Sequence, residues 1–349
     1  MNGSSSLRLY LDISALVGNW NVLNRITAGA CGAAIKANGY GLGAQSVKTY
    51  LAQAGCRDFF VSSWDEVRRL GSLDSGLSLS VLHGLREEDL SYALSVNARP
   101  VLCSPSMIQR WKNYAADRPC DVMVDTGMNR LGLTMEQAAS GLLEGLKIEN
   151  MLSHLACADE PDHPLNQKQL IQFQILFTKK QAKRYSLANS AGLFLDSAYH
   201  FDLARPGLAL YGGIPSPKAE GVIKPVVSLS AQVIQVKDVT KGDSIGYGAC
   251  FTASEKMRVA ILHIGYADGY WRAFFQKGQA VKEGVPCPVV GRISMDMITV
   301  ALPEGLAVQE GDWFSVDFAL QKAAEQTGLS QYELLTSLGD RYQSIWHHP

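Results

Sequence analysis

Short apolar segments alternate with longer segments of helical periodicity over residues 30–207. Apolar runs bounded by turn residues predict buried strands, and apolar positions three and four residues apart predict the helices between them. Eight strand-then-helix units predict a closed (β/α)8 barrel, because parallel strands need helical crossovers and eight of them close around a filled interior. The predicted strands are Gly32–Lys36, Asp58–Ser62, Leu77–Leu82, Arg99–Cys103, Asp121–Asp125, Met151–Leu155, Tyr185–Ala188 and Phe201–Ala204. The predicted helices include Ala44–Ala54, Pro105–Ala116, Met135–Leu146 and Asn166–Ala182.

After residue 207 the pattern changes to short alternating strands separated by glycine and aspartate turns. This pattern is typical of a separate, mostly β domain. The proline-containing segment 215–224 marks the boundary, and a long barrel loop is the alternative for it. We therefore predict an α/β chain with a TIM-type barrel over residues 1–220 and a mostly β domain over residues 221–349. The predicted elements of the second domain are the strands Val226–Lys237, Asp243–Tyr247, Met257–Ile264, Cys287–Arg292 and Met297–Ala301, a short helix over Leu329–Leu338, and a final strand and tail over Thr336–Pro349.

The composition describes an ordinary globular protein. Its 349 residues suffice for a barrel plus a second domain, at about 100–250 residues per domain. A formal net charge of −1 argues against nucleic acid as a partner. The start, Met1–Ser6, lacks the charged and apolar regions of a signal peptide, and no apolar run reaches the roughly 18 residues of a membrane helix, so we predict a cytoplasmic protein without a membrane partner. Seven cysteines without C-x-x-C spacing suit reduced thiols better than disulfides or a zinc site, and we expect no metal.

Lys36 ends the first predicted strand and precedes a glycine-rich turn, Gly39–Gly43. A buried lysine near other cations can have a lowered pKa and attack a carbonyl, and the glycines let backbone N–H groups approach a phosphate. Three interpretations are open for this segment alone. They are a strand end whose lysine reaches solvent, a dinucleotide-binding turn with Asp65 and Glu66 further along, and a pyridoxal phosphate (PLP) site on Lys36.

The carboxyl ends of the predicted strands carry a set of polar residues that would meet at the barrel mouth, where barrels of this type place their chemistry. Taken singly, His154 suits a core histidine, Arg205 a structural cap and Ser190 a helix N-cap. Taken together, they favour a phosphate held by Ser190 Oγ and by N–H groups at the helix starts after Asn189–Gly192 and after Arg205-Pro206-Gly207, with a nearby lysine. A barrel also disfavours the dinucleotide interpretation, which requires an open sheet. The strand-end residues are Lys36, His83, Asp125, His154, Asn189, Ser190 and Arg205.

These residues belong to motifs that occur in order along nearly the whole chain, and with them the chain resembles the alanine racemases. That family consists of PLP enzymes with an N-terminal barrel and a C-terminal β domain. The motifs are Ile35–Gly41, Asp125–Gly132, Ser153–Asp159, Ala188–Ala191, Arg205–Gly207 through Tyr211-Gly212, Gly246–Gly248, Gly265–Gly269, Gly291–Asp296 and Tyr332-Glu333.

The resemblance implies a PLP-dependent racemase of alanine that works as a homodimer with shared active sites. Lys36 would bind the cofactor covalently and act as a base on one face of the substrate Cα. Tyr247, from the second subunit, would act on the opposite face, since racemisation removes a proton from one side and returns one to the other. A phenol with an ordinary pKa of about 10 is a poor base, so Tyr247 would need support from neighbours such as His154 and Arg205.

The resemblance also implies the other contacts of the site. Arg205 would face the pyridine nitrogen and, because a guanidinium keeps its proton, leave that nitrogen unprotonated and the cofactor a weaker electron sink. Arg130 would bind the cofactor's phenolic oxygen and lie close to the substrate carboxylate. Met295 of the partner would donate its backbone N–H to that carboxylate, Tyr266 would line the entrance and Asp296 would shape the site. The remaining cofactor contacts would be Tyr40, His154, Asn189, Ser190, Gly207 and Tyr332.

One position departs from the family. Many members have a carbamate-bearing lysine two residues before the D-T-G-M segment, and this chain has Met123 there. An uncharged thioether cannot steady Arg130, so Asn129, a bound anion or another carboxylate would have to do so.

Three alternatives remain for the function. The first is a racemase of broader or serine specificity. The second is a decarboxylase of the same architecture, which Arg205 disfavours because such enzymes have an acidic residue at the ring nitrogen. The third is a PLP carrier, which would not need a β domain with Tyr247.

Overall fold

The computed structural model describes residues 5–348. Residues 1–4 of the start for which we predict no signal peptide, and Pro349, the last residue of the predicted tail, lie outside the described residues. Among the described residues, no helix is both long enough and apolar enough to cross a membrane.

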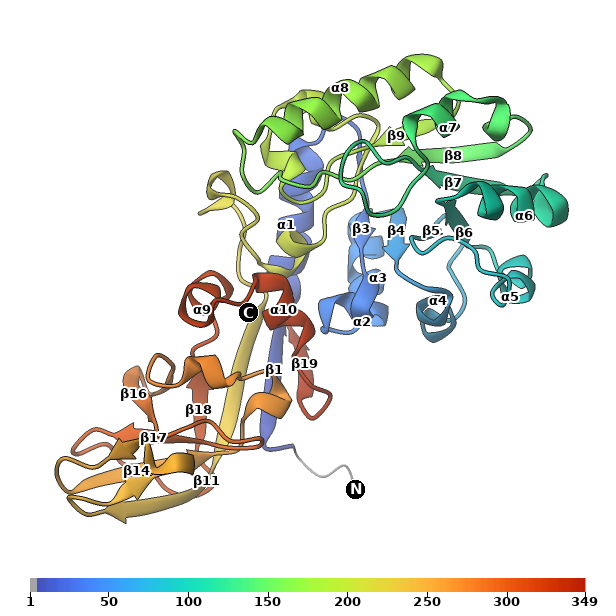
Figure 1. The fold of residues 1–349 in the computed structure, drawn as a ribbon. Coiled ribbons are helices and arrows are strands. Elements are labelled where there is room, and N and C mark those ends of the chain that lie inside the picture. The colour runs from blue at the N-terminus through green and yellow to red at the C-terminus, as the bar shows by residue number, and fades with distance from the viewer. Residues whose placement is uncertain (1–4, 349) are drawn as a thin grey trace. The chain divides into compact units, whose positions relative to one another are not determined.

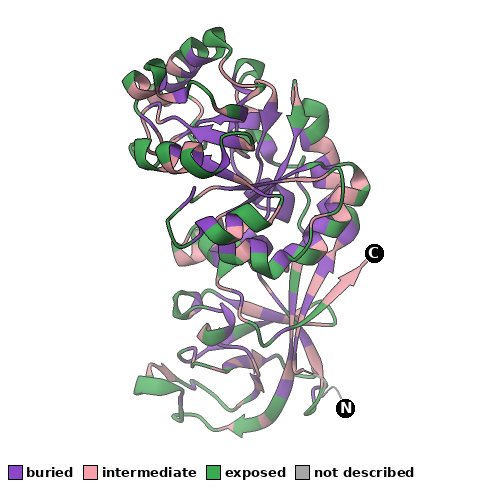
Figure 2. Ribbon diagram, turned by 90° about the vertical axis from the view of Figure 1, so that its right-hand side faces the viewer, coloured by how far each residue is buried: buried purple, intermediate pink, exposed green. Residues whose placement is uncertain are grey.

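The larger part of the chain is a barrel of parallel strands surrounded by helices (Figure 1). In Figure 2 the strands are buried and the outward faces of the helices are exposed. The barrel strands are β2 (Ala30–Cys31), β3 (Ala33–Ala34), β4 (Asp58–Val61), β5 (Ser78–Val81), β6 (Arg99–Leu102), β7 (Pro119–Met123), β8 (Lys147–Leu152), β9 (Arg184–Ser186) and β10 (Leu203–Ala204). The helices up to the end of the barrel are α1 (Ile13–Ile26), α2 (Lys36–Tyr40), α3 (Ala44–Ala54), α4 (Trp64–Leu70), α5 (Leu90–Ser95), α6 (Pro105–Ala115), α7 (Met135–Ala139) and α8 (Pro164–Lys179).

The strands close into a ring. Strands β3 to β9 form one parallel sheet in sequence order, and β10 pairs in parallel with β2. The remaining edge is joined by Asp202 N–H to Tyr185 O (3.0 Å) and by Arg205 N–H to Ala188 O (2.9 Å). Since β2 and β3 are two parts of one strand interrupted at Gly32, the predicted (β/α)8 barrel is confirmed within the described residues.

Some predicted elements have different ends. The predicted helix Met135–Leu146 ends at Ala139, because Ser140 is extended (ψ 173°) and starts a separate 3-10 turn, η1 (Gly141–Leu143). The helix predicted over Asn166–Ala182 begins at Pro164, where the His163 side chain caps it. Lys36 lies beyond the end of its strand, in the first position of α2.

A network of charged and amide side chains crosses the interior of the barrel toward the amino ends of its strands. Arg184 on β9 donates to both carboxylate oxygens of Asp58 on β4, at 2.6 and 2.9 Å, although these strands are not neighbours. Asp121 on β7 accepts from Arg99 (3.2 Å) and from the Asn150 side chain (2.8 Å). Arg184 Nε also donates to Asn150 Oδ1 (3.1 Å), which joins the two carboxylates into one network.

The second part of the chain is a mostly β unit built around a closed antiparallel sheet. Its strand order is β14-β17-β16-β15-β18-β11, with β14 pairing back onto β11. β11 serves both edges because it is long: Leu229–Gln232 pair with β18, and Val233–Val239 pair with β14, with a register shift between Val233 and Gln235. The elements are β11 (Val227–Val239), β12 (Ser244–Ile245), β13 (Phe251–Thr252), β14 (Met257–Leu262), β15 (Gln279–Lys282), β16 (Val285–Val290), β17 (Ile298–Leu302), β18 (Trp313–Val316), α9 (Leu320–Thr327), α10 (Gln331–Thr336) and β19 (Gln343–His347).

The β unit also takes in the start of the chain, which differs from the predicted division at residue 220. Strand β1 (Leu7–Asp12) pairs antiparallel with β11 and parallel with β19, so residues up to Ala15 belong to this unit. The barrel unit comprises Leu16–Leu210 and Ile214–Lys224. β1 has its partners more than 200 residues away in the chain, and a local pattern carries no sign of them.

Candidate active site

Four basic side chains come together at the mouth of the barrel. Lys36 follows β3, Arg130 lies in the loop after β7, His154 follows β8 and Arg205 follows β10. Arg130 and Arg205 both act electrostatically on Lys36 and on His154. The structure therefore brings together the four predicted site residues that carry or could carry positive charge in the barrel unit.

These surroundings change the ionisation of Lys36. Burial lowers the pKa of its amine, Arg130 and Arg205 lower it further, and the carboxylate of Glu66 opposes them. The net direction is downward, which increases the fraction of neutral amine at a given pH. A neutral amine is the form that attacks a carbonyl or accepts a proton.

The chain turns into a left-handed conformation directly after Lys36. Gly39 N–H donates to Ile35 O and Gly41 N–H to Ala37 O, each at 2.8 Å, so the turn is closed by its own backbone. A residue with a Cβ costs about 1–2 kcal/mol in this conformation, and such strain persists only where the surroundings hold it. The φ angles are 51° at Ala37, 54° at Asn38, 65° at Gly39 and 56° at Tyr40.

Arg205 is buried and fixed by backbone carbonyls. Its guanidinium donates to Ser186 O (2.8 Å) and Ser153 O (2.5 Å), and its Cζ lies 5.9 Å from the ring centre of Phe60. Burial lowers the pKa of Arg205 to about 10, with the charge of Asp121 opposing the shift. The group thus remains protonated near neutral pH and can donate hydrogen bonds there without releasing its proton.

His154 is neutral near pH 7. Burial, followed by the charges of Arg205, Arg130 and Lys36, lowers the pKa of its imidazole to about 3. Its backbone is held by Gln169, whose side-chain amide donates to His154 O at 2.8 Å.

Ser190, Gly207 and Tyr40 form a compact cradle beside this cluster. Ser190 Oγ accepts from the N–H of Gly207 (2.9 Å) and from the N–H of Ala209 (3.2 Å). A Cβ on Gly207 would lie 2.1 Å from the Tyr40 hydroxyl, so only glycine allows this approach. The hydroxyls of Ser190 and Tyr40 can donate to an anion, and the N–H groups of Gly207 and Ala209, which here donate to Ser190 Oγ, are directed to the same place. The cradle therefore fits the phosphate of PLP.

Two other strand-end residues support their own loops. Asn189 Oδ1 accepts from Gly192 N–H (2.8 Å) and so caps the turn that follows it. His83 Nε2 lies 3.0 Å from Ser62 Oγ, at the end of β4. Their side chains therefore have structural partners in the barrel unit.

Arg130 is presented by a tight loop with Asp125 at its base. Asp125 Oδ1 accepts from the N–H groups of Gly127 (2.8 Å) and Asn129 (3.1 Å). A Cβ on Gly132 would lie 2.6 Å from Asp125 N, so the loop returns to the strand only with glycine there. Asp125 thus shapes the loop that carries Arg130, rather than reaching the basic cluster itself.

Met123, the departure from the family, lies buried beneath this loop. Its carbonyl accepts from Leu133 N–H (2.9 Å), and its Cγ lies 3.2 Å from the position that a Cβ on Gly132 would take. No carboxylate within residues 5–348 forms an ion pair with Arg130, so its orientation does not come from a carboxylate in the barrel unit.

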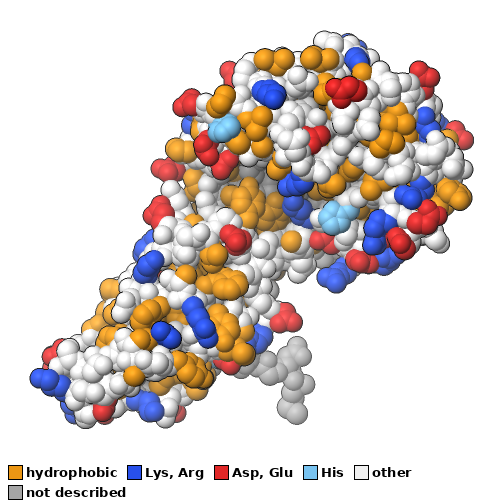
Figure 3. Space-filling model, viewed as in Figure 1, with side chains coloured by type: hydrophobic (Ala, Val, Ile, Leu, Met, Phe, Trp, Pro, Cys, Tyr) orange, Lys and Arg blue, Asp and Glu red, His pale blue; other side chains and the backbone are white. Residues whose placement is uncertain are grey.

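The predicted site residues of the β unit lie mostly on its surface. Tyr247 is the first residue of the 3-10 turn η6 (Tyr247–Ala249). Tyr247 is 71% exposed and Met295 is 53% exposed. Hydrophobic side chains gather on the face of the β unit that Figure 3 presents. Tyr332 lies in α10 and is also exposed, and Tyr266 begins the turn η7 (Tyr266–Asp268).

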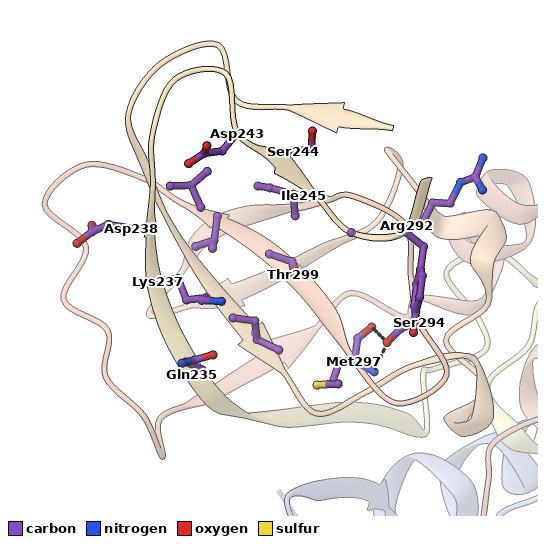
Figure 4. A pocket seen from close by; sticks show the side chains of 15 residues that line it. Gln235, Lys237, Asp238, Asp243, Ser244, Ile245, Arg292, Ser294, Met297 and Thr299 are labelled. Atoms are coloured by element: carbon purple, nitrogen blue, oxygen red, sulfur yellow. Dashed lines mark hydrogen bonds between the residues drawn. The ribbon is translucent and has the colours of Figure 1, made fainter. Parts of the chain in front are cut away.

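Tyr247 also lines a pocket of about 790 Å3 within the β unit. In Figure 4, Lys237, Asp238 and Asp243 stand on one side of this pocket and Arg292 and Ser294 on the other. The Arg292 guanidinium lies 3.3 Å from the position that a Cβ on Gly248 would take, so it packs over the turn that carries Tyr247.

Sequence reasoning missed the ion pair that Asp268, in the turn with Tyr266, forms with Arg341, a residue near the end of the chain. Asp268 is fully buried and accepts two bonds from Arg341, from Nε (2.7 Å) and Nη2 (2.8 Å). Arg341 Nη1 also donates to Asp296 (2.7 Å), and Ala267 N–H donates to Met295 O (3.0 Å). Arg341 lies 45 residues beyond Asp296, so no motif spacing links them, although Asp268 itself stands in the Gly265–Gly269 motif.

Comparisons with known proteins agree with this arrangement. Residues 11–215 match the family model described as alanine racemase, N-terminal domain, and residues 226–346 match alanine racemase, C-terminal domain. The chain is 40% identical to a catabolic alanine racemase of Agrobacterium fabrum, covering 99% of this chain and 94% of the relative. It is 41% identical to an alanine racemase of Jannaschia sp., covering 96% and 97% of the two chains. A crystal structure of alanine racemase from Bartonella henselae with covalently bound pyridoxal phosphate superposes with a TM-score of 0.91 at 34% identity, covering 99% of this chain and 100% of that one.

A parallel barrel with a half-buried lysine after one of its strands, together with a closed β unit, defines the class of two-domain barrel proteins. Barrels of this type have their chemistry at the carboxyl ends of the strands. The match to both family models covers most of its length. The chain belongs to the alanine racemase family, and the resemblance stated from its motifs is confirmed.

Proposed function

We propose that this protein is a PLP-dependent alanine racemase that acts as a homodimer in the cytoplasm. The observation that carries the proposal is the Lys36 amine, whose pKa is lowered beside an anion cradle of Ser190, Gly207 and Tyr40. The names of the relatives and the covalently bound cofactor of the Bartonella henselae protein support it.

In this proposal the barrel holds the cofactor. Lys36 would bind it covalently, and Tyr40, Ser190 and Gly207 would bind the phosphate, with Tyr332 as a further phosphate contact. When bound, PLP supplies an electron sink that makes the Cα–H bond of an attached amino acid acidic. Further cofactor contacts are Arg130, His154, Asn189 and Arg205.

Arg205 sets the strength of that sink. Its guanidinium is held by Ser153 O and Ser186 O and has a pKa of about 10, so it keeps its proton at neutral pH. It would donate a hydrogen bond to the ring nitrogen of the bound cofactor without protonating it. A weaker sink favours prompt return of a proton to Cα over competing reactions.

Two bases on opposite faces carry out the inversion. Lys36 Nζ removes or returns the proton on one face of Cα, and Tyr247 Oη does so on the other. Tyr247 is 71% exposed on its own β unit, so its hydroxyl is accessible to a second copy of the chain. Because the imidazole of His154 is neutral near pH 7, it can accept a hydrogen bond there without taking up the proton that Lys36 and Tyr247 exchange with Cα.

The substrate carboxylate is bound by Arg130 and by the backbone N–H of Met295 from the partner, with Tyr266 at the entrance and Asp296 shaping the site. Arg341 supports this part, because it bonds both Asp296 and the buried Asp268. In the domain arrangement that we propose, the barrel domain binds the cofactor and the β domain contributes Tyr247 to the partner's site.

A panel of L-amino acids tests substrate and reaction together. The purified protein loaded with PLP is incubated with each amino acid, and the D-enantiomer and released CO2 are measured. We expect D-alanine as the main product and no CO2. Lys36→Ala should lose visible absorption from covalently bound cofactor and at least 1,000-fold in activity, on the order expected for a lost nucleophile and base. Release of CO2, or unchanged colour in Lys36→Ala, would contradict the proposal.

A further inference from the structure

Glu66 connects the ends of two barrel strands next to Lys36. Its Oε1 accepts from Ala37 N–H at 2.6 Å, and its Oε2 accepts from Ser62 N–H at 2.5 Å. Ala37 is the residue after Lys36, and Ser62 is the residue after β4. One carboxylate therefore holds both the first residue of the left-handed turn and the neighbouring strand end.

The bond to Ala37 acts where the backbone is strained. Ala37 has φ 51° and ψ 47°, and its own carbonyl accepts from Gly41 N–H within the turn. Asn38 also anchors the turn, since its Oδ1 accepts from Ala44 N–H at 3.1 Å and its carbonyl accepts from Gly43 N–H at 2.8 Å. Glu66 is thus the charged acceptor at the start of the turn, bonded to the residue directly after Lys36.

The position of Glu66 in its helix shows that this contact is not a local cap. Ser63 Oγ caps α4 by accepting from Glu66 N–H at 3.4 Å, and in a capping box the glutamate would accept from the N–H of that serine. Here both carboxylate oxygens are directed instead to Ser62 and Ala37. The Glu66 side chain therefore bonds to the loops at the barrel mouth and does not cap its own helix.

We propose that Glu66 is a positioning residue for Lys36, which fixes the left-handed turn and thereby the direction from which the lysine amine reaches the reacting carbon. The inference rests on the proposed role of Lys36 as one of two bases. The charge of Glu66 also acts on the Lys36 amine and opposes the lowering of its pKa by burial, Arg130 and Arg205. The carboxylate is thus coupled to Lys36 both through the backbone and through its charge.

Glu66→Gln tests the hold on the turn. Glutamine replaces one acceptor oxygen with an NH2 donor that would face a backbone N–H, so at most one of the two bonds survives. The matched control is Asp65→Asn, which removes the same charge one residue away, from an exposed side chain paired with Arg68.

The first readout needs no cofactor. Amide hydrogen exchange is followed by mass spectrometry in the peptide spanning residues 36–43. We expect exchange to accelerate about 10-fold or more in Glu66→Gln, the size expected for a lost bond to a charged acceptor, and to stay at the wild-type rate in Asp65→Asn. Equal rates in the wild type and Glu66→Gln would overturn the inference.

The second readout separates positioning from general damage. Exchange of the α-proton with D2O is measured by NMR for L- and D-alanine separately, in the PLP-loaded protein. Tyr247→Phe should slow one enantiomer more than the other, and Glu66→Gln should slow the opposite enantiomer more, by about 10-fold, because it disturbs the other base. Equal slowing of both enantiomers in Glu66→Gln would show a structural role alone and overturn the inference.

The controls keep the two proposals apart. If wild-type protein exchanges neither enantiomer, the proposed function fails, while amide exchange still reports whether Glu66 holds the turn. If Glu66→Gln does not fold, Glu66→Asp replaces it, because it keeps the charge but is one methylene too short for both bonds. Wild-type amide exchange in Glu66→Asp would then count against the inference.

Discussion

Gly207 shows how a single missing atom shapes the site. The hydroxyl of Tyr40 occupies the space that a Cβ on Gly207 would need, at 2.1 Å, and Tyr40 is itself fixed in the left-handed turn. The Gly207 N–H is at the same time directed to Ser190 Oγ. The tyrosine ring is 6% exposed and cannot swing away freely, so any side chain at 207 must displace the cradle.

We expect Gly207→Ala to weaken PLP binding at least 10-fold and to lower the free energy of unfolding by about 1–3 kcal/mol, as for overpacked sites. Fluorescence titration of the apoprotein with PLP and thermal unfolding measure the two effects. Gly18→Ala is the matched control, because a Cβ there meets nothing within 4 Å in the helix α1 and should stabilise the fold by about 0.5–1 kcal/mol. Wild-type affinity in Gly207→Ala would show that the cradle does not hold the cofactor.

The individual site residues differ in how far the sequence could predict them. Lys36, His154 and Arg205 follow apolar strands, and the barrel geometry alone brings such positions together. Glu66 was noticed only as part of a dinucleotide pattern, because its bonds to Ala37 and Ser62 depend on the side-by-side placement of β3 and β4. The strain after Lys36 could not be predicted either, since an alanine such as Ala37 gives no indication of a positive φ.

At the scale of elements, the polar network of the barrel interior links strands that do not pair. Arg184 on β9 binds Asp58 on β4, and Ser78 on β5 donates to the same carboxylate at 2.7 Å. Burial alone would raise the pKa of Asp58, but the hydrogen bonds from Arg184 and Ser78 and the nearby charges outweigh it and hold the pKa below its usual range. The ionised carboxylate is therefore stabilised by folding.

The pH dependence of stability follows from that direction. A carboxyl whose pKa is lower in the folded state contributes stability above its unfolded pKa of about 3.9, and this contribution is lost as the pH falls through the folded pKa. We expect Asp58→Asn to lower the free energy of unfolding by about 1.5–3 kcal/mol at pH 7, and the difference from the wild type to shrink below about pH 4. Urea unfolding at both pH values measures this. Asp117→Asn, on a fully exposed side chain, is the control, and a pH-independent difference for Asp58→Asn would contradict the assignment.

The elements themselves were predicted best where they are buried on both faces. Strands such as β4 and β7 are mostly apolar and buried along nearly their whole length, and the first strand could be recognised although a glycine interrupts it. β15 and β18 were missed because they are short, half-buried strands defined by pairing with each other. The position where a helix ends, such as Ser140 after α7, depends on the backbone angles of a single residue. The spacing of apolar residues along the sequence carries no information about those angles.

At the scale of the whole molecule, the chain divides its candidate chemistry between two units. The barrel unit carries Lys36, Arg130, His154 and Arg205, and the β unit carries Tyr247 on its surface. The sequence predicted both groups through the family motifs, but physical reasoning from local pattern alone could not say which copy of the chain completes which site.

Complementation between two inactive variants tests the shared sites. Lys36→Ala and Tyr247→Phe proteins are mixed, dissociated and reassembled. If Tyr247 serves the partner's barrel, each mixed dimer contains one intact site, and a random equal mixture should regain about a quarter of the wild-type activity. If Tyr247 serves its own barrel, no mixed dimer has an intact site and no activity returns.

The parallel pairing of β1 with β19 has a consequence for the order in which the protein is made. β1 leaves the ribosome first, yet its partners are residues 227–231 and 343–347. All residues of the barrel unit precede β11, so the barrel can complete its ring while later residues are still being translated. β1 must wait without its sheet throughout that time, and the β unit becomes complete only after the end of β19 has emerged from the ribosomal tunnel.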